Sequence, residues 1–142
     1  EIERAHRYAS PDIIFIGEIR TRHAALEALR VALGSSRQLV VATIHGQDVV
    51  TALDRLAAWA RELDGDNACQ NLADALLAVV HLSLESDGEG NRKLSSPQFL
   101  LLPFRDDTKG IRAKLRDGKF HTLADDMREL KARIANKGEQ GI

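Results

Sequence analysis

The sequence is poor in cysteine and in aromatic residues. A single cysteine, Cys69, excludes a disulfide within the chain and any zinc site of the Cys-x-x-Cys type. One unpaired thiol fits a reducing compartment such as the cytoplasm, and we expect Cys69 to lie buried on a helix. Aromatic side chains make up only 4% of the chain, so the hydrophobic core must be built from Leu, Ile, Val and Ala.

The chain also lacks a long apolar run and a strong charge of either sign. No stretch approaches the roughly 20 apolar residues that span a bilayer, and the longest, from Leu72 to Leu84, contains Asp74 and His81. A net charge of −1 gives no general attraction to nucleic acid or to an anionic membrane surface. The length of 142 residues fits one domain. Because it starts without Met and inside a helical pattern, Ile2 to Tyr8, we expect a piece of a longer protein.

A turn and a short apolar strand precede the first candidate functional residue. Pro11 and Asp12 mark the turn, and the run Ile13 to Ile16 is β-branched and aromatic without alternation. Such a run is typical of a strand buried on both faces of a parallel sheet. Glu18 follows at the carboxyl end of this strand, where ligands bind in open α/β sheets. Its carboxylate can polarise a water molecule or lie near a nucleotide's magnesium; the alternative is a residue that only caps or neutralises the next turn.

A second apolar run, Gln38 to Ile44, ends in His45, and a helical pattern over residues 22–34 separates it from the first run. Strand, helix and strand predict a right-handed βαβ unit with parallel strands, and hence an α/β fold. Glu18 and His45 then lie at equivalent ends of two strands and can share one site. A lone histidine is more often structural than catalytic, but two polar residues at matched strand ends favour a site.

The rest of the chain is predicted to be helical around one β-hairpin. Alternation at 82–85, a polar turn at 86–91 and a strand at 94–102 indicate the hairpin, with Pro97 at an edge or a bulge. Helical spacing recurs in four further stretches, at about residues 48–63, 67–80, 111–116 and 123–135.

Several motifs of the chain match, in order, those of a known family. They are a strand that begins with Pro-Asp and ends in Gly-Glu before an Arg, a Thr-x-His box, an Asp-Arg-Leu segment, a Leu-Ala-rich helix and an Arg- and Gly-Lys-containing segment. The chain therefore resembles the ATPases of the type II/type IV secretion superfamily, in particular those of type IV pilus retraction and twitching motility, of conjugation and of Dot/Icm-type secretion. The matching segments are Pro11 to Arg20, Thr43 to His45, Leu53 to Leu56, Asn71 to Val80 and Ile111 to Leu123.

The resemblance implies the C-terminal part of a RecA-like P-loop NTPase domain. Residues 1–142 would form a single fragment of this domain, with 1–80 as a core portion and 81–142 as the hairpin and C-terminal helices. No Gly-x-x-x-x-Gly-Lys-Ser/Thr loop occurs in the sequence. The resemblance therefore implies that the phosphate-binding loop and an N-terminal domain precede Glu1 in the parent protein.

The resemblance also implies roles for individual residues. Glu18 would be the Walker B carboxylate, which activates the attacking water or acts through Mg²⁺, held directly or through water. His45 would sense the γ-phosphate and couple hydrolysis to movement. The residues expected to contact ATP are Glu18, Arg20, Thr43 and His45.

The family's assembly implies partners and a location. A homo-hexamer on inner-membrane secretion or pilus platform components, at the cytoplasmic face of the bacterial inner membrane, is expected, with no nucleic acid and no transmembrane segment. The chain alone should be inactive. Two alternatives differ in class: a degenerate RecA-like module with an assembly or regulatory role, and another α/β enzyme that uses Glu18 and His45 as a general acid/base pair.

Overall fold

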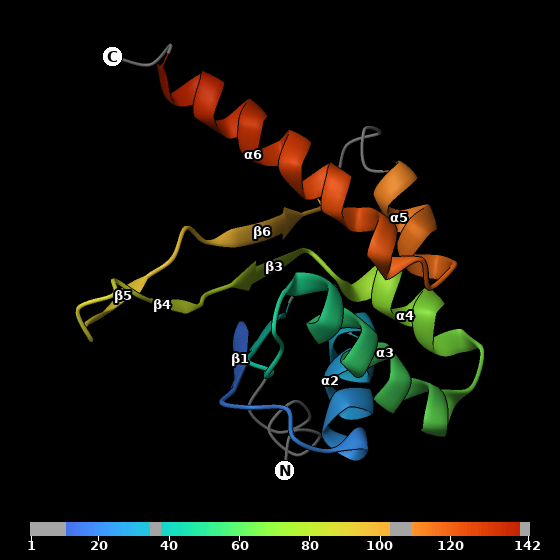
Figure 1. Ribbon diagram of the computed structural model, residues 1–142. Coiled ribbons are helices and arrows are strands. Elements are labelled where there is room, and N and C mark those ends of the chain that lie inside the picture. The colour runs from blue at the N-terminus through green and yellow to red at the C-terminus, as the bar shows by residue number, and fades with distance from the viewer. Residues whose placement is uncertain (1–10, 35–37, 103–108, 140–142) are drawn as a thin grey trace.

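The computed structural model describes residues 11–34, 38–102 and 109–139 (Figure 1). The helix predicted at Ile2 to Tyr8 lies outside the described residues. The elements in chain order are β1 (Ile13–Ile16), α2 (Arg22–Gly34), β2 (Leu39–Ala42), α3 (Val49–Asp64), α4 (Asn67–Ala75), β3 (Ala78–His81), β4 (Leu84–Ser86), β5 (Arg92–Leu94), β6 (Gln98–Leu101), α5 (Lys109–Arg116), the 3-10 helix η2 (Phe120–Thr122) and α6 (Leu123–Glu139).

The predicted βαβ unit with parallel strands is confirmed. β1 pairs with β2 in parallel, from Ile13 opposite Leu39 to Ile16 opposite Ala42, and α2 connects the two strands. α2 covers one face of this pair, where its small residues pack against Ile14 and Ile16. Short side chains on α2, such as Ala25 and Ala28, let the helix approach the strands closely. The parallel pairing brings the carboxyl ends of both strands to the same edge.

The prediction that β1 is buried on both faces is wrong in this structure. Ile14 and Ile16 are buried, but Ile13 and Phe15 are 61% and 68% exposed. The neighbouring β2 residues on that side, Leu39 and Val41, are 43% and 41% exposed. We call these four side chains the open face. α2 covers the opposite face only, and no element among the described residues buries the open face, which is why burial alternates along β1.

A capping box starts α3, close to the beginning of the helix predicted at about residues 48–63. The Asp48 carboxylate accepts a hydrogen bond from the Thr51 backbone N–H at 2.7 Å, and the Thr51 hydroxyl accepts one from the Asp48 backbone N–H at 3.0 Å. These contacts satisfy two of the donors that the start of a helix leaves without partners. The cap therefore sets the point at which the loop after β2 turns into α3.

Substituting Ala for Asp48 should lower the free energy of unfolding by about 1 kcal/mol at neutral pH, because the N-cap acceptor is lost. The Thr51 backbone N–H holds the pKa of Asp48 below its ordinary value. A carboxyl group with a depressed folded-state pKa stabilises the fold above its unfolded pKa of about 4, and this contribution disappears as the pH falls through the folded-state pKa. Urea denaturation should therefore show a difference between wild type and Asp48→Ala at neutral pH that shrinks in acid.

The matched control for this prediction is Asp54→Ala, which removes an exposed carboxylate further along α3. Its effect on stability should be small, since Asp54 makes no cap. A loss in Asp48→Ala that has the same size at both pH values would contradict the capping role.

The helix predicted through residue 80 ends earlier than expected. α4 stops at Ala75, and Leu76 is extended with φ −72° and ψ 130°. Val79 and Val80 lie in β3, where they pair antiparallel with Leu100 and Phe99 of β6. β-branched residues favour strands, and the hydrogen-bonding partner comes from a distant part of the chain. The helical spacing of these residues is therefore overridden by tertiary pairing.

The predicted hairpin is confirmed, but it is divided into two ribbons. β3 pairs with β6 next to the helices, and β4 pairs with β5 further out, with both pairs antiparallel. In Figure 1 the β4–β5 ribbon extends away from the helices. The single strand predicted at 94–102 is interrupted between Leu94 and Gln98, a segment that contains Pro97. Proline has no N–H to donate to a ladder, which explains the break.

The main core lies where α3, α4 and β6 meet the C-terminal helices. It contains fully buried leucines from α4, β6, α5 and α6 and from the loop that follows β6. Cys69 of α4 lies in the same core and is 4% exposed, as the sequence predicts. Its largest fully buried side chains are Leu72, Leu100, Leu102, Leu115, Leu123 and Val49. The predicted helices at 111–116 and 123–135 are confirmed as α5 and α6. Among the described ranges, no helix combines the length and apolar character needed to cross a membrane.

Candidate functional site

The ends of β1 and β2 hold the candidate residues side by side. Beyond the strands, the backbone N–H of Ile19 donates to the carbonyl of Thr43 at 2.8 Å, and that of Thr43 donates to Ile16 at 3.3 Å. The hydroxyl of Thr43 also donates to the carbonyl of Gly17. These bonds extend the pairing of the two segments past their last strand residues. Glu18 and the residues after Thr43 are consequently held on adjacent segments.

The structure brings Glu18, His45 and Arg20 into one cluster. Nε2 of His45 lies 3.1 Å from Oε1 of Glu18, and Nε of Arg20 donates to Oε2 of Glu18 at 2.5 Å. Each carboxylate oxygen thus has its own cationic or potentially cationic partner. The sequence argument for a shared site at matched strand ends agrees with this geometry. Thr43 is adjacent, but its hydroxyl donates to the carbonyl of Gly17, the residue before Glu18.

The cluster keeps Glu18 ionised. The hydrogen bond from Arg20 holds the pKa of Glu18 below its ordinary value; partial burial acts in the opposite direction, and the charges of Arg20 and His45 lower the pKa further. The same contact raises the pKa of Arg20, so its guanidinium stays charged. An ionised carboxylate only accepts hydrogen bonds, and it can orient a water molecule or contact a cation.

The cluster lies at the surface. The side chain of Glu18 is 20% exposed, whereas those of Arg20 and His45 are 76% and 86% exposed. Across the part of the chain that the structure describes, no group of three or more His, Cys, Asp or Glu residues could hold a metal ion. A single carboxylate does fit Mg²⁺, which keeps several waters and usually takes one or two carboxylates together with substrate phosphates. Glu18 could therefore hold Mg²⁺ only jointly with phosphate oxygens.

Two residues that sequence reasoning did not assign to the site, Arg55 and His81, support the loop after β2. Nη1 of Arg55 donates to the carbonyl of His45 at 2.7 Å, and Nε2 of His81 lies 3.0 Å from the carbonyl of Gly46. Gly46 itself is pressed against α3, since a Cβ there would lie 2.7 Å from Cβ and 2.9 Å from N of Ala52. Arg55 was visible only as part of a motif. His81 is 35 residues away from Gly46, and no local signal in the sequence connects them.

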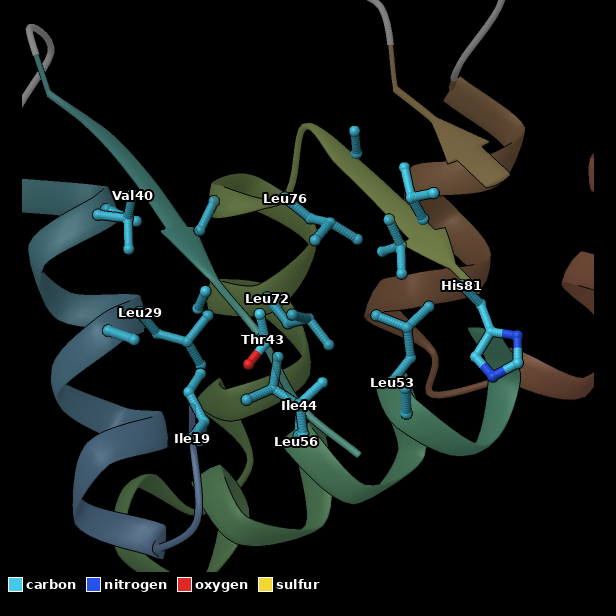
Figure 2. Close-up of a pocket in the computed structure, with 18 residues that line it drawn as sticks. Ile19, Leu29, Val40, Thr43, Ile44, Leu53, Leu56, Leu72, Leu76 and His81 are labelled. Carbon is cyan, nitrogen blue, oxygen red and sulfur yellow. The ribbon is translucent and has the colours of Figure 1, made fainter. Parts of the chain in front are cut away.

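An apolar cleft of about 290 Å³ adjoins the segments that follow β1 and β2 (Figure 2). Ile19 and Ile44, the neighbours of Glu18 and His45 in the chain, line it, and the only polar side chains in its lining are Thr43 and His81. Such a lining can hold the apolar side chains of Ile19 and Ile44, which lie next to the cluster in the chain. It offers few polar groups to a charged ligand.

Comparison with known proteins places the chain in a family. Residues 4–109 match the family model described as Type II/IV secretion system protein. The chain belongs to the type II/IV secretion system protein family. The chain is 30% identical over 122 residues to the uncharacterized protein YggR of Escherichia coli K12. This match covers 84% of this chain and 34% of YggR. A shorter match, 46% identical over 46 residues, is to the protein transport protein HofB homolog of Haemophilus influenzae and covers 32% of this chain and 10% of that protein.

Solved structures of similar fold support the α/β assignment. The pilus retraction motor PilT with bound ADP matches with a TM-score of 0.71 and 23% identity, over 90% of this chain and 35% of PilT. The Legionella pneumophila ATPase DotB matches with a TM-score of 0.69 and 19% identity, over 99% of this chain and 38% of DotB. This member of the family therefore spans about a third of the length of the proteins that it resembles.

Proposed function

We propose that this chain is the C-terminal part of a RecA-like motor domain in an ATPase that powers secretion, conjugation or pilus dynamics. The observation that carries the proposal is the ionised Glu18, held between His45 and Arg20 at the adjacent ends of two parallel strands. The similarity to PilT with bound ADP and to the ATPase DotB supports it. ATP and Mg²⁺ are the proposed ligands.

In the proposed site, Glu18 orients the attacking water and accepts its proton as the bond to the γ-phosphorus forms, while the bond from that phosphorus to the β,γ-bridging oxygen breaks and ADP leaves. Phosphoryl transfer depends on a positioned nucleophile and on neutralised phosphate charge, and an ionised carboxylate supplies the first. Bound Mg²⁺ would supply part of the second, held by Glu18 directly or through water together with phosphate oxygens. Arg20 keeps Glu18 ionised and in place.

His45 has the position of a phosphate sensor in this proposal. Its ring faces Glu18 at 3.1 Å and is 86% exposed, so a phosphate group could reach it. An imidazole N–H that points to a carboxylate can instead donate to a phosphate oxygen. If the His45 ring left Glu18 and donated to a phosphate oxygen instead, the loop that carries His45 would move. Thr43 would contribute by holding the peptide before Glu18.

We further propose that the parent protein works as a homo-hexamer on an inner-membrane secretion or pilus platform, at the cytoplasmic face. The similarity to the pilus retraction motor PilT and to the ATPase DotB supports a motor or ATPase role. Membership in the type II/IV secretion system protein family supports a link to secretion. The proposal includes a phosphate-binding loop supplied from outside these 142 residues, because the sequence contains no Gly-x-x-x-x-Gly-Lys-Ser/Thr motif.

The test compares ATP hydrolysis by the 142-residue chain with hydrolysis by the full-length protein that carries it. We expect no turnover above the buffer rate for the chain alone, since it lacks the loop that grips the phosphates. The full-length protein should hydrolyse ATP in the presence of Mg²⁺. A coupled assay for ADP release, with light scattering to confirm that both samples are soluble, measures this.

Two results would contradict the proposal. Hydrolysis by the chain alone would show that Glu18 and His45 belong to a different kind of enzyme. No hydrolysis by a full-length protein with an intact phosphate-binding loop would favour a degenerate module with an assembly or regulatory role.

A further inference from the structure

The backbone of the loop that carries His45 is held from two sides. The carbonyl of His45 accepts a hydrogen bond from Nη1 of Arg55 at 2.7 Å, and the next carbonyl, that of Gly46, lies 3.0 Å from Nε2 of His81. A carbonyl oxygen accepts, so Nε2 of His81 carries the proton of this hydrogen bond. Two consecutive carbonyl groups are thus engaged by side chains from α3 and from β3.

These two contacts act on the residue whose placement matters most. His45 is 86% exposed, and among the described residues the side chain that its imidazole contacts is that of Glu18. Little packing therefore holds the imidazole in place, and its position depends on its own backbone. The backbone at Gly46 has no side chain to restrict it, although it is wedged against Ala52. Fixing the carbonyl on each side of this glycine removes much of that freedom.

We propose that Arg55 and His81 are positioning residues that hold the His45–Gly46 backbone and thereby keep the His45 imidazole against Glu18. The inference rests on the proposed function for its effect on turnover, but not for its effect on His45 itself. Because His81 is the last residue of β3, the arrangement also connects the His45 loop to the β3–β6 ribbon.

The first experiment measures the position of His45 without relying on activity. Diethyl pyrocarbonate modifies accessible imidazole nitrogens, and mass spectrometry of the full-length protein reports the rate at His45, with exposed His23 of α2 as an internal reference. In Arg55→Met and in His81→Leu, Nε2 of His45 should be released from Glu18, so modification of His45 should rise several-fold relative to His23. Arg55→Lys and His81→Gln keep an N–H donor and should restore the wild-type rate.

The second experiment measures ATP turnover of the same variants. We expect kcat to fall about ten- to a hundredfold in Arg55→Met and His81→Leu with KM for ATP nearly unchanged, since small misplacements of a catalytic group have effects of this size. In a His45→Ala background, neither substitution should lower kcat further, because both act through His45. Thermal unfolding identifies any variant that has lost its fold, and the Lys and Gln variants then decide.

The outcomes separate this inference from the proposed function. An unchanged rate of modification at His45 in soluble, folded variants overturns the positioning role, even if the full-length protein is an active ATPase. A raised rate at His45 in a protein without ATPase activity supports the positioning role and overturns the proposed function. A full loss of kcat that persists in the His45→Ala background shows a general structural effect and also overturns the inference.

Discussion

Replacing Glu18 with Gln should abolish ATP turnover of the full-length protein while ATP still binds. Gln has the same shape, but it is neutral and cannot take the proton of the attacking water. It also gives up the charge that pairs with Arg20 and His45. Removal of a general base usually costs about 10²- to 10⁴-fold in rate, and we expect kcat to fall by this amount. Steady-state hydrolysis and equilibrium binding of a fluorescent ATP analogue give the two readouts.

The matched control is Glu129→Gln on α6. Glu129 also pairs with an arginine, Arg133, at 2.8 Å, but both side chains are well exposed and far along the chain from the strand ends. Exposed pairs contribute little to stability, so this variant should keep both turnover and fold. A normal rate in Glu18→Gln would leave Glu18 with the plain role of neutralising Arg20.

Gly46→Ala should cause the largest loss of stability among the substitutions considered near the cluster. The new methyl group would meet Ala52 at 2.7 Å from its Cβ and 2.9 Å from its backbone N, so α3 or the loop must shift. Overpacking of this kind typically lowers the free energy of unfolding by about 1–3 kcal/mol. Because the shift moves the His45 loop, turnover of the full-length protein should fall with it. Urea denaturation measures the first effect and ADP release the second.

Gly34→Ala provides the control for Gly46→Ala. Gly34 is the last residue of α2, and a Cβ there would meet no atom of the described residues within 4 Å. Alanine is the better helix former, so this variant should be as stable as wild type or slightly more stable. Wild-type stability in Gly46→Ala would mean that the loop does not approach α3 as closely as the structure indicates.

Local sequence patterns predicted the part of the fold that holds the candidate site. The apolar run at Ile13 to Ile16, the helical spacing at 22–34 and the run that ends before His45 each reported an element in the right place. The rule that parallel strands end at one edge then brought Glu18 and His45 together, and the contact between them agrees. Their roles in hydrolysis come from the family resemblance and remain predictions.

Features that depend on distant partners could not be predicted in this way. Val79 and Val80 have helical spacing with Leu72 and Leu76, and only the pairing with β6 makes them a strand. The apolar run of β1 suggested two buried faces, but burial depends on which layers are present, and no element among the described residues covers the side of Ile13 and Phe15. The contact of His81 with Gly46 joins residues 35 positions apart and has no local signature.

The open face of Ile13, Phe15, Leu39 and Val41 affects the tendency of the isolated chain to aggregate. A flat apolar surface on a short sheet is a place where copies of a protein adhere to one another, and unpaired strand edges add to this tendency. Precipitation should therefore set in as the concentration of the isolated chain rises. Dilute samples or a mild detergent should keep the isolated chain in solution. Activity measured on an aggregated sample would not report on the chemistry of Glu18.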